Sequence, residues 1–374
     1  MSQGIEYFCT LKPIEPYFLG GERNFVFDEQ PTDKVDYYLT SEDIPQQSTI
    51  VGLLRYLMLA KAGLLSNTYY GADQERKQKI RADNAAIHSQ QAEMIGSQGF
   101  FYEADKPLQD YGKLYAVSPL FLLDADRHRL VRTPLNHVVG QKVYQPFAME
   151  GGFVTDNGAD TILPVNFKAK DWLTDSFVDL DAAEHRLTER GAVFNCQEHT
   201  RIGRGEEEKG YFKQVYKYLT NDYKFGFYCR AEAGTLPETD VVYMGQGKSA
   251  FQFTAEKTDG GKLAEFCERI RALPGCDKAD VYYAVSDLFL NLTAEENAQF
   301  AYTIIEKKQF RTLNSTADAA SYRASRKKSA LFQLIRAGSV FYLPAGHADV
   351  LGSTLAQAGL RQAGFNHVER LGGK

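Results

Sequence analysis

Apolar and polar residues alternate in several short stretches of the chain, as they do in half-buried β-strands. The first stretch runs from Ile5 to Leu11. Two aromatic stretches, Tyr211–Thr220 and Tyr223–Ala231, follow each other with only Asn221 and Asp222 between them. Because this dipeptide is typical of a tight turn, the simplest prediction for the pair is a β-hairpin.

Other stretches have the spacing of helices. After Pro45, Ser48 or Thr49 stands where an N-cap is expected, ahead of an apolar stripe. The stripe consists of Ile50, Leu53, Leu54, Leu57 and Met58. A second stripe, from Leu263 to Ile270, predicts another buried helix. The highly charged stretch from Ala72 to Ala92 predicts a helix with a solvated face.

The remaining pattern sets the fold class. Further strands are expected at 241–243, 251–254, 281–290, 301–310, 338–343 and 365–368, and a further helix at 349–357. Strand pairs interleaved with single helices predict an α+β fold with two ferredoxin-like (RRM-like) units and long loop insertions. We expect an N-terminal domain at 1–190 and a C-terminal domain at 191–374.

Composition and charge narrow the class of protein. The chain has 374 residues, 44% of them apolar, and a net charge of −5. It is therefore globular, and any nucleic-acid site must be a local patch. Its five cysteines lack C-x-x-C spacing, which argues against a disulfide framework or a zinc site. Because neither a signal peptide nor a membrane span is visible, we expect a cytoplasmic protein with no membrane partner.

Two glycine-rich turns carry the candidate chemistry. His199–Phe212 contains three glycines together with Arg201 and Arg204, whose guanidinium groups suit phosphate. Tyr243–Phe253 repeats the design with Gly245, Gly247 and Lys248 between aromatic residues. Two such loops beside each other indicate single-stranded nucleic acid.

Two further features favour an anionic ligand. Free N–H groups at the predicted start of the first helix are suited to bind a phosphate. Gln46 and Gln47 at this position are able to hydrogen-bond a sugar or a base edge. The alternative interpretation is a capped helix without a ligand. Between Ala319 and Ala348 there is no acidic residue. This window carries five cations, Arg323, Arg326, Lys327, Lys328 and Arg336, which favours a basic groove.

One short stretch raises the question of a metal. Asp124, Asp126 and His128 lie within five residues of one another. Since no further ligand cluster accompanies them, a turn between two strands is favoured over a metal site, and neither a metal nor a cofactor is predicted.

In combination, these segments resemble the RAMP superfamily of CRISPR proteins. The resemblance is to the subunit of type III-B (Cmr-type) RNA-guided effector complexes that binds the 5′ tag of the guide RNA. The similar segments are Leu11–Ile14, Gly20–Phe25, Pro45–Arg55, Thr200–Arg204 with Gly210–Phe212, Arg336–Tyr342 and Ala363–Asn366. They span the chain from end to end, although the glycine-rich loops are shorter than in many RAMP proteins.

The resemblance implies a non-catalytic scaffold that clamps the guide RNA tag. It also implies docking to the large polymerase/cyclase-like subunit and to the backbone RAMP subunits of the same complex. The candidate RNA-binding residues are Gly21, Arg23, Gln46, Gln47, Ser48, Thr49, Arg55, His199, Arg201, Arg204, Gly245, Gly247, Lys248, Lys327 and Lys328. Lys327 and Lys328 are included for their charge alone.

Three other functions compete with this one. Related RAMP proteins cut guide RNA precursor with a histidine, for which His199 is the candidate, but a general base needs a second group to hold it. Gly247-Lys248-Ser249 is similar to part of a P-loop, yet Val242 stands where the motif needs glycine and the following residues alternate like a strand. A nucleotide hydrolase is therefore rejected. An interaction module without RNA contacts is the third alternative.

Overall fold

The computed structural model describes most of the chain. It covers residues 4–20, 23–26, 36–67, 73–96, 102–103, 106–107, 110–134, 137–139, 142–147, 152–155, 176–182, 185–202, 211–220, 222–245, 248–275, 279–290, 302–310, 313–316, 325–328, 332–344, 351, 355 and 358–372. Of the predicted site residues, Gly21, Arg204 and Gly247 lie outside these ranges.

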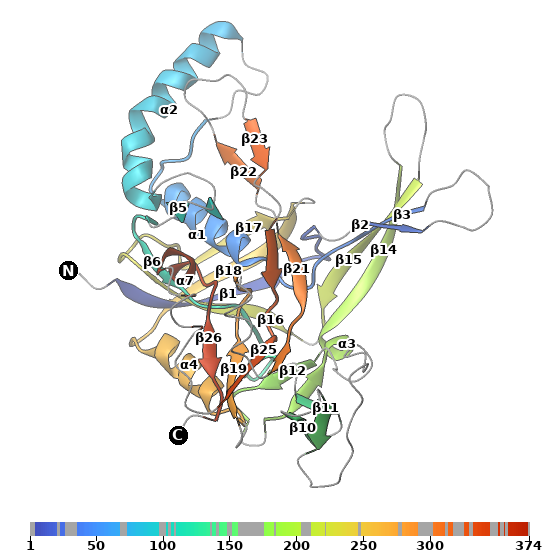
Figure 1. Cartoon of the computed structure of the whole chain (residues 1–374). Helices are drawn as coiled ribbons and strands as arrows, with labels where there is room; N and C mark the ends of the chain where they lie inside the picture. Colours follow the sequence, from blue (N-terminus) through green and yellow to red (C-terminus); the bar gives the residue numbers. More distant parts are fainter. Residues whose placement is uncertain are drawn as a thin grey trace.

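A nine-stranded sheet forms the centre of the molecule, and all its neighbouring strands are antiparallel (Figure 1). Its order is β13 (Leu187–Glu189), β12 (Ser176–Asp179), β8 (Arg129–Arg132), β7 (Phe121–Leu123), β16 (Lys224–Ala231), β1 (Ile5–Pro13), β18 (Ser249–Lys257) and β17 (Thr239–Met244), with β6 (Leu114–Val117) also paired to β16. The strand predicted from Ile5 is confirmed as β1, which lies between β16 and β18.

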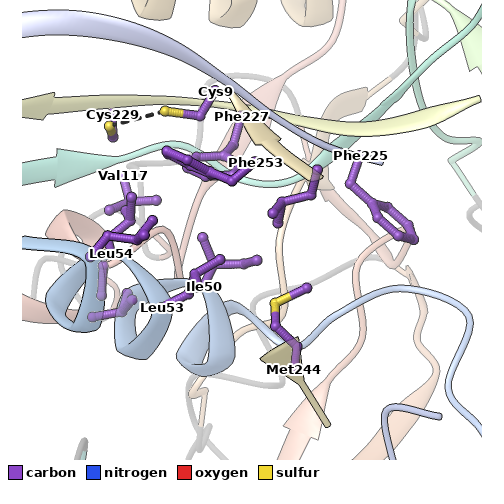
Figure 2. Close-up of a cluster of buried hydrophobic side chains, with 14 of the residues drawn as sticks. Cys9, Ile50, Leu53, Leu54, Val117, Phe225, Phe227, Cys229, Met244 and Phe253 are labelled. Atoms are coloured by element: carbon purple, nitrogen blue, oxygen red, sulfur yellow. Dashed lines mark hydrogen bonds between the residues drawn. The ribbon is translucent and has the colours of Figure 1, made fainter. Parts of the chain in front are cut away.

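Helix α1 (Gln47–Lys61) covers one face of this sheet. All five residues of its predicted apolar stripe are buried, and Figure 2 shows Ile50, Leu53 and Leu54 directed toward the sheet residues Phe227 and Phe253. The N-cap prediction was wrong by two to three residues, because the helix already begins after Gln46. Helix α2 (Gln74–Ile95) is mostly exposed, as its charged sequence predicted.

The opposite face of the sheet is covered partly by helix α4 (Lys262–Arg271) and a C-terminal sheet. This second sheet has the order β20 (Tyr302–Ile304), β25 (Val340–Pro344), β19 (Ala279–Ala284) and β26 (Val368–Arg370). Phe8 and Phe121 of the central sheet pack with Phe266 of α4 and Tyr283 of β19 in one buried cluster. The predicted helix at 263–270 is confirmed.

A four-stranded sheet projects from one side of the body (Figure 1). It contains β14 (Phe194–Ile202), β15 (Tyr211–Leu219), β3 (Asp36–Thr40) and β2 (Arg23–Val26), and β15 pairs with β3 in parallel. The predicted hairpin between 211–220 and 223–231 is wrong. Both strands exist, but β15 pairs with β14, whereas β16 pairs with β1 in the central sheet.

Short elements complete the described chain. They are α3 (Arg190–Val193), α7 (Ala358–Gln362), β4 (Tyr102–Glu103), β5 (Lys106–Pro107), β9 (His137–Val139), β10 (Lys142–Phe147), β11 (Gly152–Thr155), β21 (Lys307–Phe310), β22 (Leu313–Thr316), β23 (Ser325–Lys328) and β24 (Phe332–Ile335). The strand predicted at 301–310 is divided into β20 and β21, and the one at 281–290 ends at Ala284. The last strand begins at Val368, so its prediction at 365–368 was early. The helix predicted at 349–357 lies mostly outside the described residues.

The chain thus has a mixed α+β fold with mostly antiparallel sheets, as predicted. Two ferredoxin-like units and a domain boundary near residue 190 stay predictions. The central sheet takes strands from both sides of that position. Within the described ranges, no helix is both long and apolar enough for a membrane span.

Candidate nucleic-acid interface

The loop that leads into α1 joins the projecting sheet to the body. The backbone N–H of Ser41 donates to the carbonyl oxygen of Val215 in β15, at 3.0 Å. The Ser41 hydroxyl accepts the N–H of Leu19 at 2.9 Å, and the N–H of Glu42 donates to Gly20 at 3.1 Å. These bonds fix both strand β15 and the segment 17–20 beside the start of α1.

The segment 17–20 continues this junction to the second glycine-rich turn. Phe18 N–H donates to the Ser249 hydroxyl at 3.1 Å. Gly245 has φ of +77°, and a Cβ at this position would lie 2.1 Å from the carbonyl oxygen of Phe18. Glycine is therefore required there for both its conformation and its size. The turn between β17 and β18 is held directly against the segment that also contacts the loop before α1.

A buried carboxylate lies at the centre of the junction. Asp43 forms ion pairs with Arg190 and with Lys217, whose Nζ is 3.1 Å from Oδ1. Burial by itself would raise the pKa of Asp43, but the hydrogen bond and charge of Arg190, together with Lys217, outweigh it and the pKa lies below its ordinary value. The hydroxyl of Tyr17 donates to the Asp43 carbonyl oxygen at 2.7 Å. The carboxylate thus stays ionised and links three elements.

Aromatic rings connect this junction to His199. The rings of Phe18 and Tyr216 have centroids 5.6 Å apart, and those of Tyr216 and His199 are 4.9 Å apart in an edge-on arrangement. Phe18 is buried, whereas Tyr216 and His199 are half-buried on the projecting sheet. Of these rings, Tyr216 and His199 offer partly open surface for a stacked base.

A cleft of about 100 Å³ opens beside the start of α1. Cationic side chains line it, but each faces a carboxylate. Lys308 Nζ lies 3.6 Å from Glu42 Oε2, and Arg132 and Arg336 approach Glu306 at 2.7 and 2.6 Å. Burial would raise the pKa of Glu306, yet the two guanidinium groups outweigh burial and lower it. Charge in the cleft is therefore locally balanced.

The predicted residues of α1 have differing environments. Gln46 is the N-cap but makes no side-chain capping bond, and Ser48 and Thr49 are half-buried. Gln47 is only 7% exposed and donates its amide Nε2 to the Ser118 carbonyl oxygen at 2.9 Å. Arg55 lies over the ring of Tyr111, 5.3 Å from its centroid. Gln47 and Arg55 thus have structural partners within the chain.

The other predicted residues are distributed over three places. Lys248 is exposed in the same turn as Gly245, and its N–H donates to the Gly245 carbonyl oxygen at 3.2 Å. In β14, Arg201 pairs with Phe212, close to His199, and in β2, Arg23 pairs with Leu39. Lys327 and Lys328 lie in β23, which pairs with β22 in a separate two-stranded sheet among the described residues.

Sequence reasoning missed Asp43, Arg190 and Lys217. Arg190 and Lys217 are single cations in mixed segments, and Asp43 looks like an ordinary acid before a helix. The only available signal was that Asp43 precedes Pro45 next to a predicted phosphate seat. Within the described chain, the side chains with metal-ligand spacing lie elsewhere, at the turn between β7 and β8.

Comparison with known proteins gives limited similarity. No protein-family model matches the sequence, and no curated protein matches it. One similar solved chain belongs to the cryo-EM structure of the Type III-B Cmr-beta bound to cognate target RNA, with 11% identity and a TM-score of 0.48 over 96% of this chain and 96% of that chain. Another belongs to the same kind of complex with target RNA and AMPPnP, with 10% identity and a TM-score of 0.42 over 90% and 86% of the two chains. Because both TM-scores lie below 0.5, we base the proposed function on the residues of this chain.

The close approach at Gly245 leads to a stability prediction. Gly245→Ala should reduce the free energy of unfolding by about 1–3 kcal/mol more than Gly234→Ala does. Both glycines have nearly the same φ, +77° and +78°, but nothing lies within 4 Å of a Cβ at Gly234. The control therefore reports conformational strain alone, about 1–2 kcal/mol. Urea denaturation of the two variants measures the difference, and equal losses would contradict the close contact with Phe18.

The ion pairs of Asp43 lead to a pH-dependent prediction. Because its pKa is lowered in the folded protein, the carboxylate stabilises the fold above its unfolded pKa of about 3.9 and loses this effect as pH falls through the folded value. Asp43→Asn should lower the free energy of unfolding at pH 7 by about 3 kcal/mol. The difference in free energy of unfolding between wild type and Asp43→Asn should become smaller below about pH 4.

Denaturation at pH 7 and at several lower pH values tests this. The control is Asp222→Asn, which removes a carboxylate from the exposed surface pair with Lys12 and should cause no measurable change. If the difference in free energy of unfolding between wild type and Asp43→Asn does not depend on pH, the ionised carboxylate is not the cause of the lost stability.

Proposed function

We propose that the protein is a non-catalytic RNA-binding subunit of a type III-B CRISPR effector complex. In this role it holds the 5′ tag of the guide RNA. It also docks the large polymerase/cyclase-like subunit and the backbone RAMP subunits of the same complex. The RNA-binding region is the junction around the loop 41–47, together with the turn at Gly245 and the base of the projecting sheet.

The observation that carries the proposal is that segments quoted for the family resemblance meet at this loop, although they are spread along the whole chain. Arg336 and Ala337 line the same cleft as Gln47. A Cβ at Gly364 would lie 2.1 Å from Gln47 Nε2. The segment Ala363–Asn366 therefore packs against the start of α1. Short motifs that only formed local turns would not be expected to lie close together in the fold.

The chemistry of the junction suits a single strand of RNA. Two cations belong to the elements that form the junction. Lys248 is exposed in the turn between β17 and β18, and Arg201 is a residue of β14 in the projecting sheet. Gly245 is exposed in this turn, so its backbone is accessible to a phosphate from the solvent side. Tyr216 and His199 supply the partly open rings on which a base stacks.

A binding role is favoured over RNA cleavage by the surroundings of His199. Its ring contacts the ring of Tyr216, and among the described residues no carboxylate or other polar group forms a hydrogen bond that would orient it. A histidine base without such an orienting partner is poorly prepared for proton transfer. The same residue is well placed as a stacking or phosphate-contacting group.

The RNA-binding proposal predicts a specific loss of affinity. Arg201→Ala and Lys248→Ala should each weaken binding of a guide RNA with its 5′ tag by about tenfold. Each should also lower the slope of log affinity against log salt by about 0.7, the value for one lost phosphate contact on a single strand. Filter binding or fluorescence anisotropy at several salt concentrations measures both quantities for the full chain.

The matched control removes an exposed cation from another sheet. Arg370→Ala breaks a surface pair with Asp280 in the C-terminal sheet and should leave both affinity and salt slope unchanged. An RNA of equal length with a scrambled tag tests whether the tag itself is read. If Arg201→Ala and Lys248→Ala both bind the tagged RNA like wild type, the junction is not its site.

The non-catalytic assignment predicts that the purified chain leaves guide RNA precursor intact. His199→Ala should then lower the affinity for RNA by about fivefold to a hundredfold, because stacking is lost. The amount of cleavage products should not change. Incubation of wild type and variant with labelled precursor measures this. Robust cutting by wild type that is lost in the variant would support the endoribonuclease alternative instead.

A further inference from the structure

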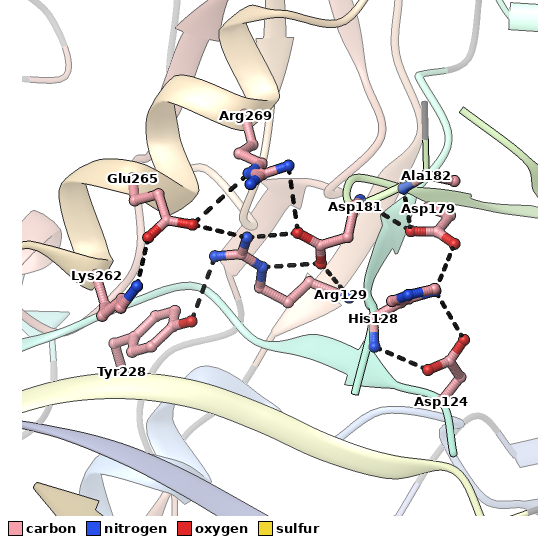
Figure 3. Close-up of polar contacts among 10 residues, drawn as sticks. All are labelled: Asp124, His128, Arg129, Asp179, Asp181, Ala182, Tyr228, Lys262, Glu265 and Arg269. Carbon is pink, nitrogen blue, oxygen red and sulfur yellow. Dashed lines mark hydrogen bonds and ion pairs between the residues drawn. The ribbon is translucent and has the colours of Figure 1, made fainter. Parts of the chain in front are cut away.

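Three side chains of the kind that bind metals meet beside the turn between β7 and β8 (Figure 3). Asp124 follows β7, His128 precedes β8, and Asp179 ends β12, which pairs with β8. Nδ1 of His128 lies 3.4 Å from Oδ2 of Asp124 and 3.2 Å from Oδ2 of Asp179. The three ligand atoms all lie within 4.8 Å of one another.

Local hydrogen bonds hold the two carboxylates in position. Oδ1 of Asp124 accepts the backbone N–H of His128 at 2.8 Å, which closes the turn. Oδ1 of Asp179 accepts the N–H groups of Asp181 and Ala182 at 2.9 and 3.1 Å. In both residues the first oxygen is used by the backbone, and the second oxygen is left facing His128. This orientation by outer hydrogen bonds is common among metal-binding carboxylates.

Two of the facing atoms are buried and have no hydrogen bond. Asp179 is 1% exposed, and its Oδ2 accepts none, while Nδ1 of His128 is likewise buried and without a hydrogen-bond partner. Although these atoms are 3.2 Å apart, they are not aligned as donor and acceptor. Both atoms are therefore available to a third partner that lies within reach of the two. A buried carboxylate oxygen without a partner is costly, unless a cation compensates it.

Neighbouring cations do not supply that compensation. Arg129 is engaged with Asp181 and Glu265, at 2.5 and 3.2 Å. Arg269 pairs with the same two acids, as Figure 3 shows. Arg186 reaches only Oδ2 of Asp124, at 3.8 Å, and its side chain is largely exposed. Among the described residues, His128 is therefore the one group that forms an ion pair with Oδ2 of Asp179, and the imidazole is charged only when it is protonated.

We propose that Asp124, His128 and Asp179 bind a divalent transition-metal cation, with Zn²⁺ or Mn²⁺ as the fitting ions. Bonds of about 2.0–2.2 Å to such an ion place neighbouring ligand atoms about 3.0–3.5 Å apart, and the two His128 distances of 3.4 and 3.2 Å agree with this. An imidazole nitrogen favours these ions over Mg²⁺, which prefers oxygen ligands throughout.

Water would complete the coordination from the open side. His128 is 40% exposed, and Asp124 borders a cavity of about 200 Å³ that is also lined by Arg127 and Thr254. Bound metal would link the β7–β8 turn to the end of β12 near one edge of the central sheet. Because the unfolded chain has no such site, metal binding should stabilise the folded protein.

The test uses the full chain after removal of metals with a chelator. Titration calorimetry with ZnCl₂ and MnCl₂ should show one site per chain, and both ions should raise the thermal midpoint more than MgCl₂ does. His128→Gln and Asp179→Asn should weaken binding of the metal alone by about tenfold to a hundredfold. Asp126→Asn removes an exposed carboxylate from the same turn, outside the cluster, and should bind like wild type.

Circular dichroism shows which variants fold, and His128→Gln decides the result if Asp179→Asn does not fold. Absence of binding to wild-type protein would overturn the proposal, since His128 would then be only an ion-pair partner of the two carboxylates. Equal binding by wild type and His128→Gln would also overturn it, as would equal losses in His128→Gln and Asp126→Asn. None of these outcomes depends on RNA binding, so the metal site and the proposed function are tested independently.

Discussion

The arrangement of the molecule depends on the buried carboxylate of Asp43. It lies where the loop before α1, the strand β15 and the helix α3 meet, through Lys217 and Arg190. Desolvation of a carboxylate opposes folding, and a single cation in imperfect geometry rarely offsets it. Here two cations share the task, while the Tyr17 hydroxyl fixes the backbone of the same residue by donating to its carbonyl oxygen. The two ion pairs of Asp43 thus specify how the projecting sheet is attached to the body. The position of the candidate interface depends on this attachment.

Much of the fold was predictable because periodicity reports which face of an element is buried. The stripe of α1 identifies its core-facing residues correctly, and the alternation at Ile5–Leu11 correctly indicates the strand β1. Periodicity does not report which strand is the partner, and the predicted hairpin failed for this reason. Asp222, with φ of +60°, turns the chain out of one sheet and into another. β15 then carries Lys217 toward Asp43, while β16 carries Phe225 and Phe227 into the main core.

The candidate sites were less predictable, since their members are distant in sequence. Gln47 has the residue type and position expected of a ligand contact, yet its amide is used to bind Ser118 inside the protein. Arg55 likewise covers Tyr111. The β7–β8 turn shows the same limit of local patterns. Asp124 and His128 were visible, but their partner Asp179 arrives through the pairing of β8 with β12, which no local pattern indicates.

Charge balance in the cleft beside α1 also constrains how RNA would be held. Arg132 and Arg336 already bind Glu306, so a phosphate entering there would have to displace that carboxylate and leave it unpaired. Such an exchange gains little free energy, because one anion replaces another. A tag bound at this junction would therefore rely on exposed Lys248, on backbone near Gly245 and on aromatic stacking, rather than on the lining cations. This agrees with a chain of net charge −5, in which bulk electrostatic attraction to RNA is absent.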